Sequence, residues 1–257
     1  MLYLGTSGYY YQDWVGPFYP QGMTKQDYLP FYTRFFNSVE INYTHYGQPT
    51  QATMQGMVDR TPDDFKFAVK SYKDMTIGRS QDPMVYREYR YGIEPLVKSG
   101  KLGCILLQFP NGFNLTKANV NHLAFIREQW PDLPMAVEFR HASWVEDPRT
   151  FEFLREQQLA YCCVDEPQLQ GLVPPVVELT ALYGYVRFHG RNVDKWYKSE
   201  HAWERYNYHY TEQEMEEWLP RVKQLREKAE DVYIYFNNHY GANSVQNAQQ
   251  FQALLEA

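Results

Sequence analysis

Three residues that can carry positive charge occupy every second position in the segment GYVRFHGRN, residues 184–192. They are Arg187, His189 and Arg191. Side chains two residues apart on a β-strand point to the same face, so a strand here would present all three on one side. Guanidinium groups bind carboxylates and phosphates through paired hydrogen bonds. A histidine can exchange a proton near neutral pH. The segment therefore predicts a site where the arginines bind an anion and the histidine transfers a proton.

Similar polar residues end most of the short apolar segments in the chain. These segments cover residues 2–7, 38–42, 65–70, 102–109, 135–140, 160–165, 184–190 and 232–237. When the apolar side chains of each segment are assigned to one face, the other face carries Glu40, Asn42, Lys70, Gln108, Glu138, Arg140, Asp165 and Asn237. We expect these side chains to converge with the row that ends in Arg191.

Helical patterns separate most of these segments, and Asp82-Pro83 fits an N-cap followed by proline at the first helical position. Strands that alternate with helices over about 250 residues predict an α/β fold, a TIM-barrel-like (β/α)8 parallel barrel. We expect one domain over residues 1–257, with an irregular stretch in the Pro-rich link 166–183 between strands six and seven. An open doubly wound sheet is the rival, but GTSGYYYQDW lacks the G-x-G-x-x-G phosphate turn.

Composition narrows the class of partner. The chain has 257 residues and a formal net charge of −6, which argues against a generally basic surface. Nucleic acid is therefore a possible partner, but one for which the net charge gives no support. The N-terminal sequence has no signal-peptide pattern, and no apolar run is long enough for a membrane span. Three cysteines without CxxC spacing predict buried free thiols and a cytoplasmic location. The oligomeric state stays open.

The charged set suggests roles for its members. Glu138, Asp165 and His189 form a candidate acid/base set, because two carboxylates and an imidazole would face one pocket. The positive residues number four (Lys70, Arg140, Arg187, Arg191), against three negative ones (Glu40, Glu138, Asp165), and this small excess suits an anionic ligand. The alternative is an ion-pair network that only fills the barrel.

A metal site is a further alternative, although no cofactor is expected. Glu40, Glu138, Asp165 and His189 could supply carboxylate and imidazole ligands to a divalent ion. Four nearby cations oppose this, and the sequence has no H-x-H or H-E-x-x-H spacing.

Aromatic residues are concentrated in the loops that follow the predicted strands. They are candidates for a stacking rim around a sugar ring or a base, with packing inside the loops as the alternative. The set is Tyr9, Tyr10, Tyr11, Trp14, Tyr43, Tyr46, Trp144, Trp196 and Tyr197, from which Trp14 and Trp144 are selected as site residues. The segment 191–210 mixes charge with aromatic residues, and it fits either a lid over the site or a static cover.

Several motifs together resemble the YecE-like proteins, the family known as domain of unknown function seventy-two. They are GTSGYYYQDWVGPFYP, VEINYTHYGQPT, FKFAVKSYKDMT, LGCILLQFP, AVEFRHASW, YVRFHGR and YFNNHYGANSVQNA, in that order along nearly the whole chain. The resemblance implies a TIM-barrel-like fold and supplies no activity. It adds His141 and Asn238 to the candidate site residues. One departure is Thr76-Ile77, where family members often have Thr-His.

These observations favour an enzyme with its site at the carboxyl ends of the barrel strands, where TIM-barrel chemistry occurs. The expected substrate is anionic or phosphorylated, and a hydrolase or phosphodiesterase is the preferred reaction class. The alternative is a non-catalytic protein that binds nucleic acid or a phosphorylated metabolite. A third hypothesis is a scaffold whose polar interior is structural only.

Overall fold

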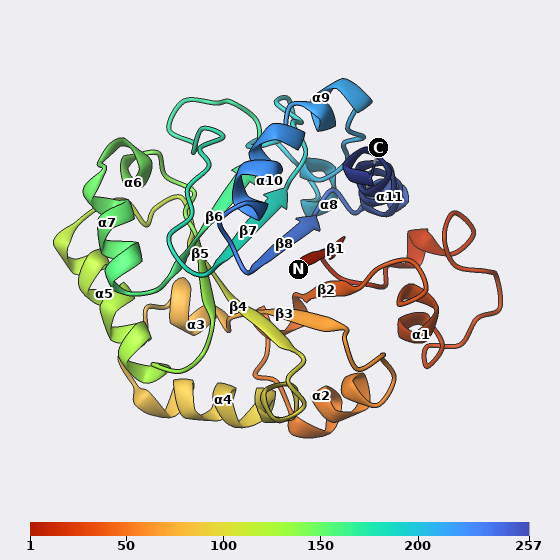
Figure 1. The fold of residues 1–257 in the computed structure, drawn as a ribbon, viewed down its shortest axis with the longest axis horizontal. Coiled ribbons are helices and arrows are strands. Elements are labelled where there is room, and N and C mark those ends of the chain that lie inside the picture. The colour runs from red at the N-terminus through yellow and green to blue at the C-terminus, as the bar shows by residue number, and fades with distance from the viewer. Residues whose placement is uncertain (257) are drawn as a thin grey trace.

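The fold is known from a computed structural model that describes residues 1–256, except for the side chain of Ala202. Eight parallel strands form one sheet in the order β1-β8-β7-β6-β5-β4-β3-β2. The strands are β1 (Leu2–Thr6), β2 (Ser38–Ile41), β3 (Lys66–Lys70), β4 (Leu102–Gln108), β5 (Met135–Glu138), β6 (Ala160–Asp165), β7 (Tyr183–Phe188) and β8 (Asp231–Phe236). The sheet curls into a nearly closed barrel, which confirms the predicted (β/α)8 fold (Figure 1).

Helices surround the barrel and lie against the outside of its strands (Figure 1). The longer helices are α2 (Gln51–Val58), α4 (Pro83–Lys98), α5 (Lys117–Gln129), α7 (Arg149–Glu156), α10 (Leu219–Arg226) and α11 (Asn243–Glu256). The shorter ones are α1 (Tyr28–Tyr32), α3 (Lys73–Thr76), α6 (Ser143–Glu146), α8 (Ala202–Arg205) and α9 (Glu212–Glu216), with 3-10 turns η1 (Gln12–Trp14), η2 (Tyr43–His45) and η3 (Tyr240–Ala242). As predicted, Asp82 caps α4, because its carboxylate accepts the Met84 N–H at 2.9 Å.

The barrel is least regular where β1 meets β2. Between these strands the backbone pairing is limited to the bridge between Ser7 and Glu40. Toward the amino ends of the two strands, the side chain of Asn37 takes the place of the backbone hydrogen bonds. Its amide accepts the Leu4 N–H at 2.9 Å and donates to the Leu2 carbonyl at 2.8 Å. A Cβ at Gly5 would lie 2.0 Å from the Ser38 carbonyl oxygen, so this close approach requires glycine.

The link between β6 and β7 contains no helix in residues 166–182, all of which the structure describes. This confirms the irregularity that the prolines predicted. Thr180 ties the link to the barrel, because its hydroxyl accepts the Tyr161 N–H at 2.7 Å and donates to the Leu159 carbonyl at 2.6 Å. The link therefore stays extended and packed.

Two further predictions concern the cysteines and the length of the helices. Cys104, Cys162 and Cys163 are buried free thiols, as expected. Within residues 1–256, none of the helices combines the length and the apolar character needed to cross a bilayer.

Tyrosine rings form the floor below the polar site inside the barrel. Tyr185 and Tyr235 lie 5.4 Å apart between ring centroids, and Tyr233 lies 6.3 Å from Tyr185. Gly103 leaves room for this layer, because a Cβ there would lie 2.7 Å from the Tyr233 ring. The floor separates the charged side chains above it from the amino-terminal end of the barrel.

Candidate functional site

The centre of the polar interior is the carboxylate of Glu138, at the end of β5. It lies 2.6 Å from the Nε atom of Arg140 and 3.2 Å from the Nε2 atom of His189, and it also accepts a hydrogen bond from Arg187. Glu138 and His189 have no exposed surface, and Arg187 is 1% exposed. Three of the residues predicted to converge therefore do meet around one buried carboxylate.

A second carboxylate, Glu40 at the end of β2, completes the pairing of Arg187. Their closest atoms, Nη2 and Oε1, lie 2.7 Å apart. The hydroxyl of Ser7 donates to Glu40 Oε1 at 2.6 Å, and that of Tyr185 donates to Oε2 at 2.8 Å. Sequence reasoning did not single out Ser7 or Tyr185. Because each buried charge has an opposite partner and further hydrogen bonds, the cluster satisfies the rule for buried ions.

The two predicted proton carriers in this cluster are fixed in one charge state at pH 7. The guanidinium groups of Arg140 and Arg187 outweigh the effect of burial and hold the pKa of Glu138 well below its usual value. Burial, with the charge of Arg140 beside it, lowers the pKa of His189 to about 3. Glu138 is therefore a carboxylate and His189 a neutral imidazole.

The amide of Asn237 orients His189. Its Nδ2 atom lies 3.1 Å from Nδ1 of the imidazole. The other ring nitrogen, Nε2, lies 3.2 Å from Oε1 of Glu138 and 3.1 Å from Nη2 of Arg140, so both nitrogens of the neutral ring have partners. Asn237 thus belongs to the site as predicted, as a positioning residue.

Glu166, directly after β6, is a member of the site that the sequence did not reveal. Its carboxylate lies 2.7 Å from Nη1 of Arg140 and accepts the Val173 N–H at 3.3 Å. Burial raises its pKa to about 7, with a further contribution from the charge of Glu138. The only sequence signal was its position, one residue after a strand end.

The side chains of Asp165 and Arg191 lie outside the barrel interior, so the prediction that they point toward the barrel axis is wrong. Asp165 faces outward, where it pairs with Arg191 at 2.7 Å and accepts hydrogen bonds from Tyr210 at 2.6 Å and Trp218 at 2.7 Å. Cys162 points inward in β6, with its Sγ atom 3.9 Å from Glu138 Oε2. Gly190 has φ of +87°, which turns the chain so that Arg191 leaves the row.

Lys70, at the end of β3, is the interior cation without a partner. Among residues 1–256 its ammonium makes no hydrogen bond or ion pair, although its backbone carbonyl accepts from Thr44 at 2.5 Å and from Tyr89 at 3.0 Å. Burial, and then the positive charge of Arg187, lower its pKa to about 8. Lys70 is half-buried, so the mouth gives it access to solvent.

Polar groups with unused hydrogen-bonding capacity lie at the ends of the strands on either side of β3, which carries Lys70. Gln108 is half-buried and accepts a long hydrogen bond of 3.4 Å from Arg187. The Oδ1 atom of Asn42 is buried and has no partner among the described residues. His45, which the sequence analysis did not select, has Nδ1 3.3 Å from the Ser71 carbonyl, and burial lowers its pKa to about 4. Its Nε2 atom therefore carries a free lone pair.

Four other predicted site residues have local structural contacts instead. Trp14 and Trp144 have no exposed surface, so the stacking rim formed by these two is wrong. Their indole N–H groups donate to the carbonyls of His239 at 2.7 Å and Phe113 at 2.6 Å. His141 lies 2.9 Å from the Ser143 hydroxyl, and Asn238 donates to Asn247 Oδ1 at 2.9 Å.

The segment 191–210 covers part of the mouth through Trp196. The indole is 3% exposed and lies 5.6 Å from the guanidinium carbons of both Arg140 and Arg205. Its ring centroid lies 6.5 Å from that of His189. An ion pair of 2.7 Å between Lys195 and Glu204 closes the segment on itself. The segment that the sequence predicted as either a lid or a static cover therefore packs on the buried cluster through Trp196.

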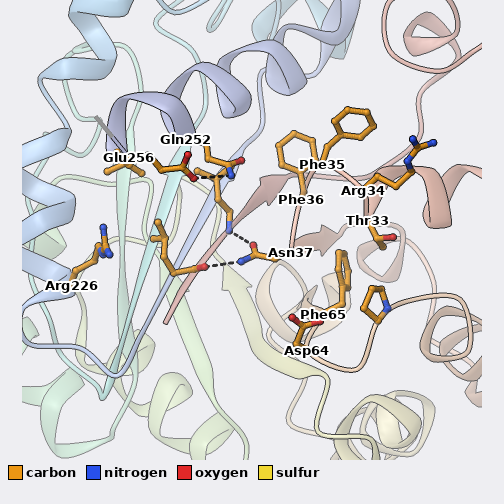
Figure 2. A pocket seen from close by; sticks show the side chains of 14 residues that line it. Thr33, Arg34, Phe35, Phe36, Asn37, Asp64, Phe65, Arg226, Gln252 and Glu256 are labelled. Atoms are coloured by element: carbon orange, nitrogen blue, oxygen red, sulfur yellow. Dashed lines mark hydrogen bonds between the residues drawn. The ribbon is translucent and has the colours of Figure 1, made fainter.

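A separate cavity of about 570 Å³ lies at the amino ends of β1 and β2, away from the charged cluster (Figure 2). Asn37 lies in its wall and makes the hydrogen bonds that join β1 to the segment before β2. Side chains of Phe35, Phe36 and Phe65 give it an apolar part. This cavity shares none of the predicted site residues.

The metal set considered from the sequence does not assemble, because Asp165 faces away from Glu40 and Glu138. Among residues 1–256, no three His, Cys, Asp or Glu side chains are grouped so that they could hold a metal ion. In addition, the carboxylates of Glu40 and Glu138 already form ion pairs with the guanidinium group of Arg187.

Fold and site together define a parallel (β/α)8 barrel with a charged cluster at the carboxyl ends of its strands. The chain belongs to the family described as "Protein of unknown function DUF72", which it matches over residues 3–257. It is similar to the UPF0759 protein YunF of Bacillus subtilis, with 33% identity over all of this chain and 95% of that protein.

Two crystal structures of DUF72 family proteins have the same fold. The one from Thermotoga maritima has a TM-score of 0.92 and 37% identity, with both chains covered completely. The one from Enterococcus faecalis has a TM-score of 0.90 and 29% identity, with 100% of this chain and 96% of that chain covered. The family description carries no activity, so function has to be argued from the site.

Proposed function

We propose that the protein is an enzyme that binds an anionic or phosphorylated substrate at the carboxyl-end mouth of the barrel. The observation that carries the proposal is the isolated ammonium of Lys70. The nearest carboxylates, Glu40 and Glu138, are already paired with arginines, so neither is free to neutralise it. A partly buried cation without a counter-ion favours a ligand that brings negative charge.

The amides at the ends of the two strands next to β3 suit the same ligand. A phosphate or carboxylate oxygen at the ammonium would find the amide N–H groups of Gln108 and Asn42 as additional donors. The interior holds three formally positive residues and three formally negative ones. They are Lys70, Arg140 and Arg187 against Glu40, Glu138 and Glu166. The net positive charge that the sequence predicted for the interior is therefore absent. The proposed attraction is local, because every charge except that of Lys70 has its partner.

Hydrolysis of a phosphate ester, including a phosphodiester, is the reaction that we propose. A group with a pKa near the working pH is the best proton carrier, and Lys70 has a pKa of about 8. Its ammonium would pair with the phosphate. As water attacks the phosphorus and the ester P–O bond breaks, the ammonium would give a proton to the leaving oxygen, and the proton released by the water would return to the amine through solvent. Glu138 and His189 would hold Arg140 and Arg187 in place, although the sequence analysis expected both to act in an acid/base set with Asp165.

The test is turnover of chromogenic phosphate mono- and diesters by the wild type, K70M and K98M. Lys98 lies on α4, is 73% exposed and pairs with Glu94, so it controls for the loss of one positive charge. We expect hydrolysis in the wild type and K98M and its loss in K70M. Equal turnover in K70M and the wild type would reject the role of Lys70.

A binding protein is the second candidate, because the fixed charge states of Glu138 and His189 leave few groups that can move protons. It would hold a phosphorylated metabolite or nucleic acid with an affinity that falls as salt rises. Salt-dependent binding that requires Lys70, without product, would favour this function over the enzyme.

A further inference from the structure

Lys70 and Lys101, which directly precedes β4, have opposite surroundings. Lys101 is 4% exposed, and its ammonium donates to the Val58 carbonyl at 2.9 Å, the Thr61 carbonyl at 2.8 Å and the Thr61 hydroxyl at 3.2 Å. All three of its N–H groups are used. Lys70 has no such partner among the described residues, so its nitrogen can lose a proton without breaking a contact.

The surroundings of Lys70 make the neutral amine easier to reach than it is for a lysine in water. Arg187 and Arg140 are its cationic neighbours, and the carboxylates near it are bound by those same arginines. A lysine that is desolvated beside another cation is the arrangement that activates an amine as a nucleophile. A residue needed only for permanent positive charge would be better served by arginine, which does not deprotonate.

We propose that Lys70 attacks the carbonyl carbon of an aldehyde or ketone that also carries a phosphate or carboxylate, and forms a Schiff base with it. This narrows the substrate class, and it rests on the proposed anion site but not on hydrolysis. The neutral amine adds to the carbonyl, and the carbinolamine loses water. The balanced step joins a lysine ammonium and a carbonyl compound to give a protonated imine and one water molecule, with no oxidant or reductant.

The proton that leaves Lys70 before attack passes to solvent, because the half-buried side chain reaches the open side of the mouth. His45 is not its acceptor, because burial lowers the pKa of this imidazole to about 4, well below that of Lys70.

Trapping with cyanoborohydride tests the step, since it reduces an imine to a stable secondary amine. The probes are pyruvate, glyoxylate and dihydroxyacetone phosphate, with acetone and dihydroxyacetone as uncharged controls. We expect peptide mass spectrometry to find Lys70 heavier by the mass of the carbonyl compound less one oxygen atom. Labelling by the anionic probes should exceed that by the uncharged ones on the order of tenfold, and inorganic phosphate should suppress it.

Lys101 is the internal control, and K70M is the matched variant. Labelling of Lys70 should rise with pH around 8, the pKa of this amine, and Lys101 should stay unlabelled. No adduct at Lys70 with any of the three anionic probes would overturn the proposal, as would equal labelling of K70M. Phosphate binding that needs Lys70, with no adduct, would refute the Schiff base and leave the anion site standing. An adduct that phosphate does not suppress would refute the anion site instead.

Discussion

Replacing Glu138 by glutamine should destabilise the protein far more than removing an exposed carboxylate. The amide keeps the shape of the side chain but removes the charge shared by Arg140, Arg187 and His189. Breaking a fully buried ion pair costs roughly 3–5 kcal/mol, because the remaining charge stays buried. For a chain of this size that lowers the melting temperature by roughly 6–20 °C.

The matched control is D132N. Asp132 pairs with Arg90 through two hydrogen bonds of 2.7 and 2.9 Å, but the two side chains are 56% and 41% exposed. Exposed pairs contribute about 0–1 kcal/mol, so this variant should unfold almost with the wild type. Urea denaturation at pH 7, followed by fluorescence and circular dichroism, gives the free energy of unfolding of each protein.

The pH dependence adds a second check. The pKa of Glu138 is depressed in the folded state, so its stabilisation is complete above the unfolded value of about 4.3 and is lost as pH falls below it. The difference between the wild type and E138Q should therefore be largest near pH 7 and shrink below about pH 4. A difference under about 1 kcal/mol at pH 7 would refute the view that this carboxylate anchors the cluster.

Three further outcomes are expected. K70M should be more stable than the wild type at pH 7, because the folded state disfavours the charged amine. This gain in the free energy of unfolding should shrink between pH 8 and about 10.4, where the amine loses its proton. A K70M variant less stable than the wild type at pH 7 would contradict the prediction. D165N should lose about 2 kcal/mol of stability through its contacts with Tyr210 and Trp218 but keep the phosphate affinity of the wild type in calorimetry; weakened binding would place Asp165 in the site after all. W196A should speed the modification of His189 by diethyl pyrocarbonate and leave buried His122 unchanged, and an unaltered rate at His189 would show that Trp196 does not cover it.

The sequence predicted the barrel and part of the site where one face of a strand is clearly apolar. In β7 the apolar residues alternate with Arg187 and His189, and both point inward as expected. In β6 the segment AYCCVD is apolar on both faces, so alternation could not say which side meets the axis, and Asp165 was assigned to the wrong one. Its partners Tyr210 and Trp218 lie far along the chain.

Other features depend on contacts that spacing does not encode. Glu166 follows a strand and becomes a site residue only because the link after it folds back through Val173. Trp14 and Trp144 stand in loops, but these loops bury them, with carbonyl partners for their N–H groups. That Lys70 lacks a counter-ion follows from which carboxylates the arginines occupy, and only the three-dimensional arrangement reveals it.

The most direct test of the central claim is where an anion binds. A crystal soaked in tungstate, a heavy-atom mimic of phosphate, would locate it by anomalous scattering. The proposal predicts a peak within hydrogen-bonding distance of Lys70 Nζ at the barrel mouth, and its loss in K70M crystals. Peaks confined to surface lysines and arginines, with none at the mouth, would contradict it.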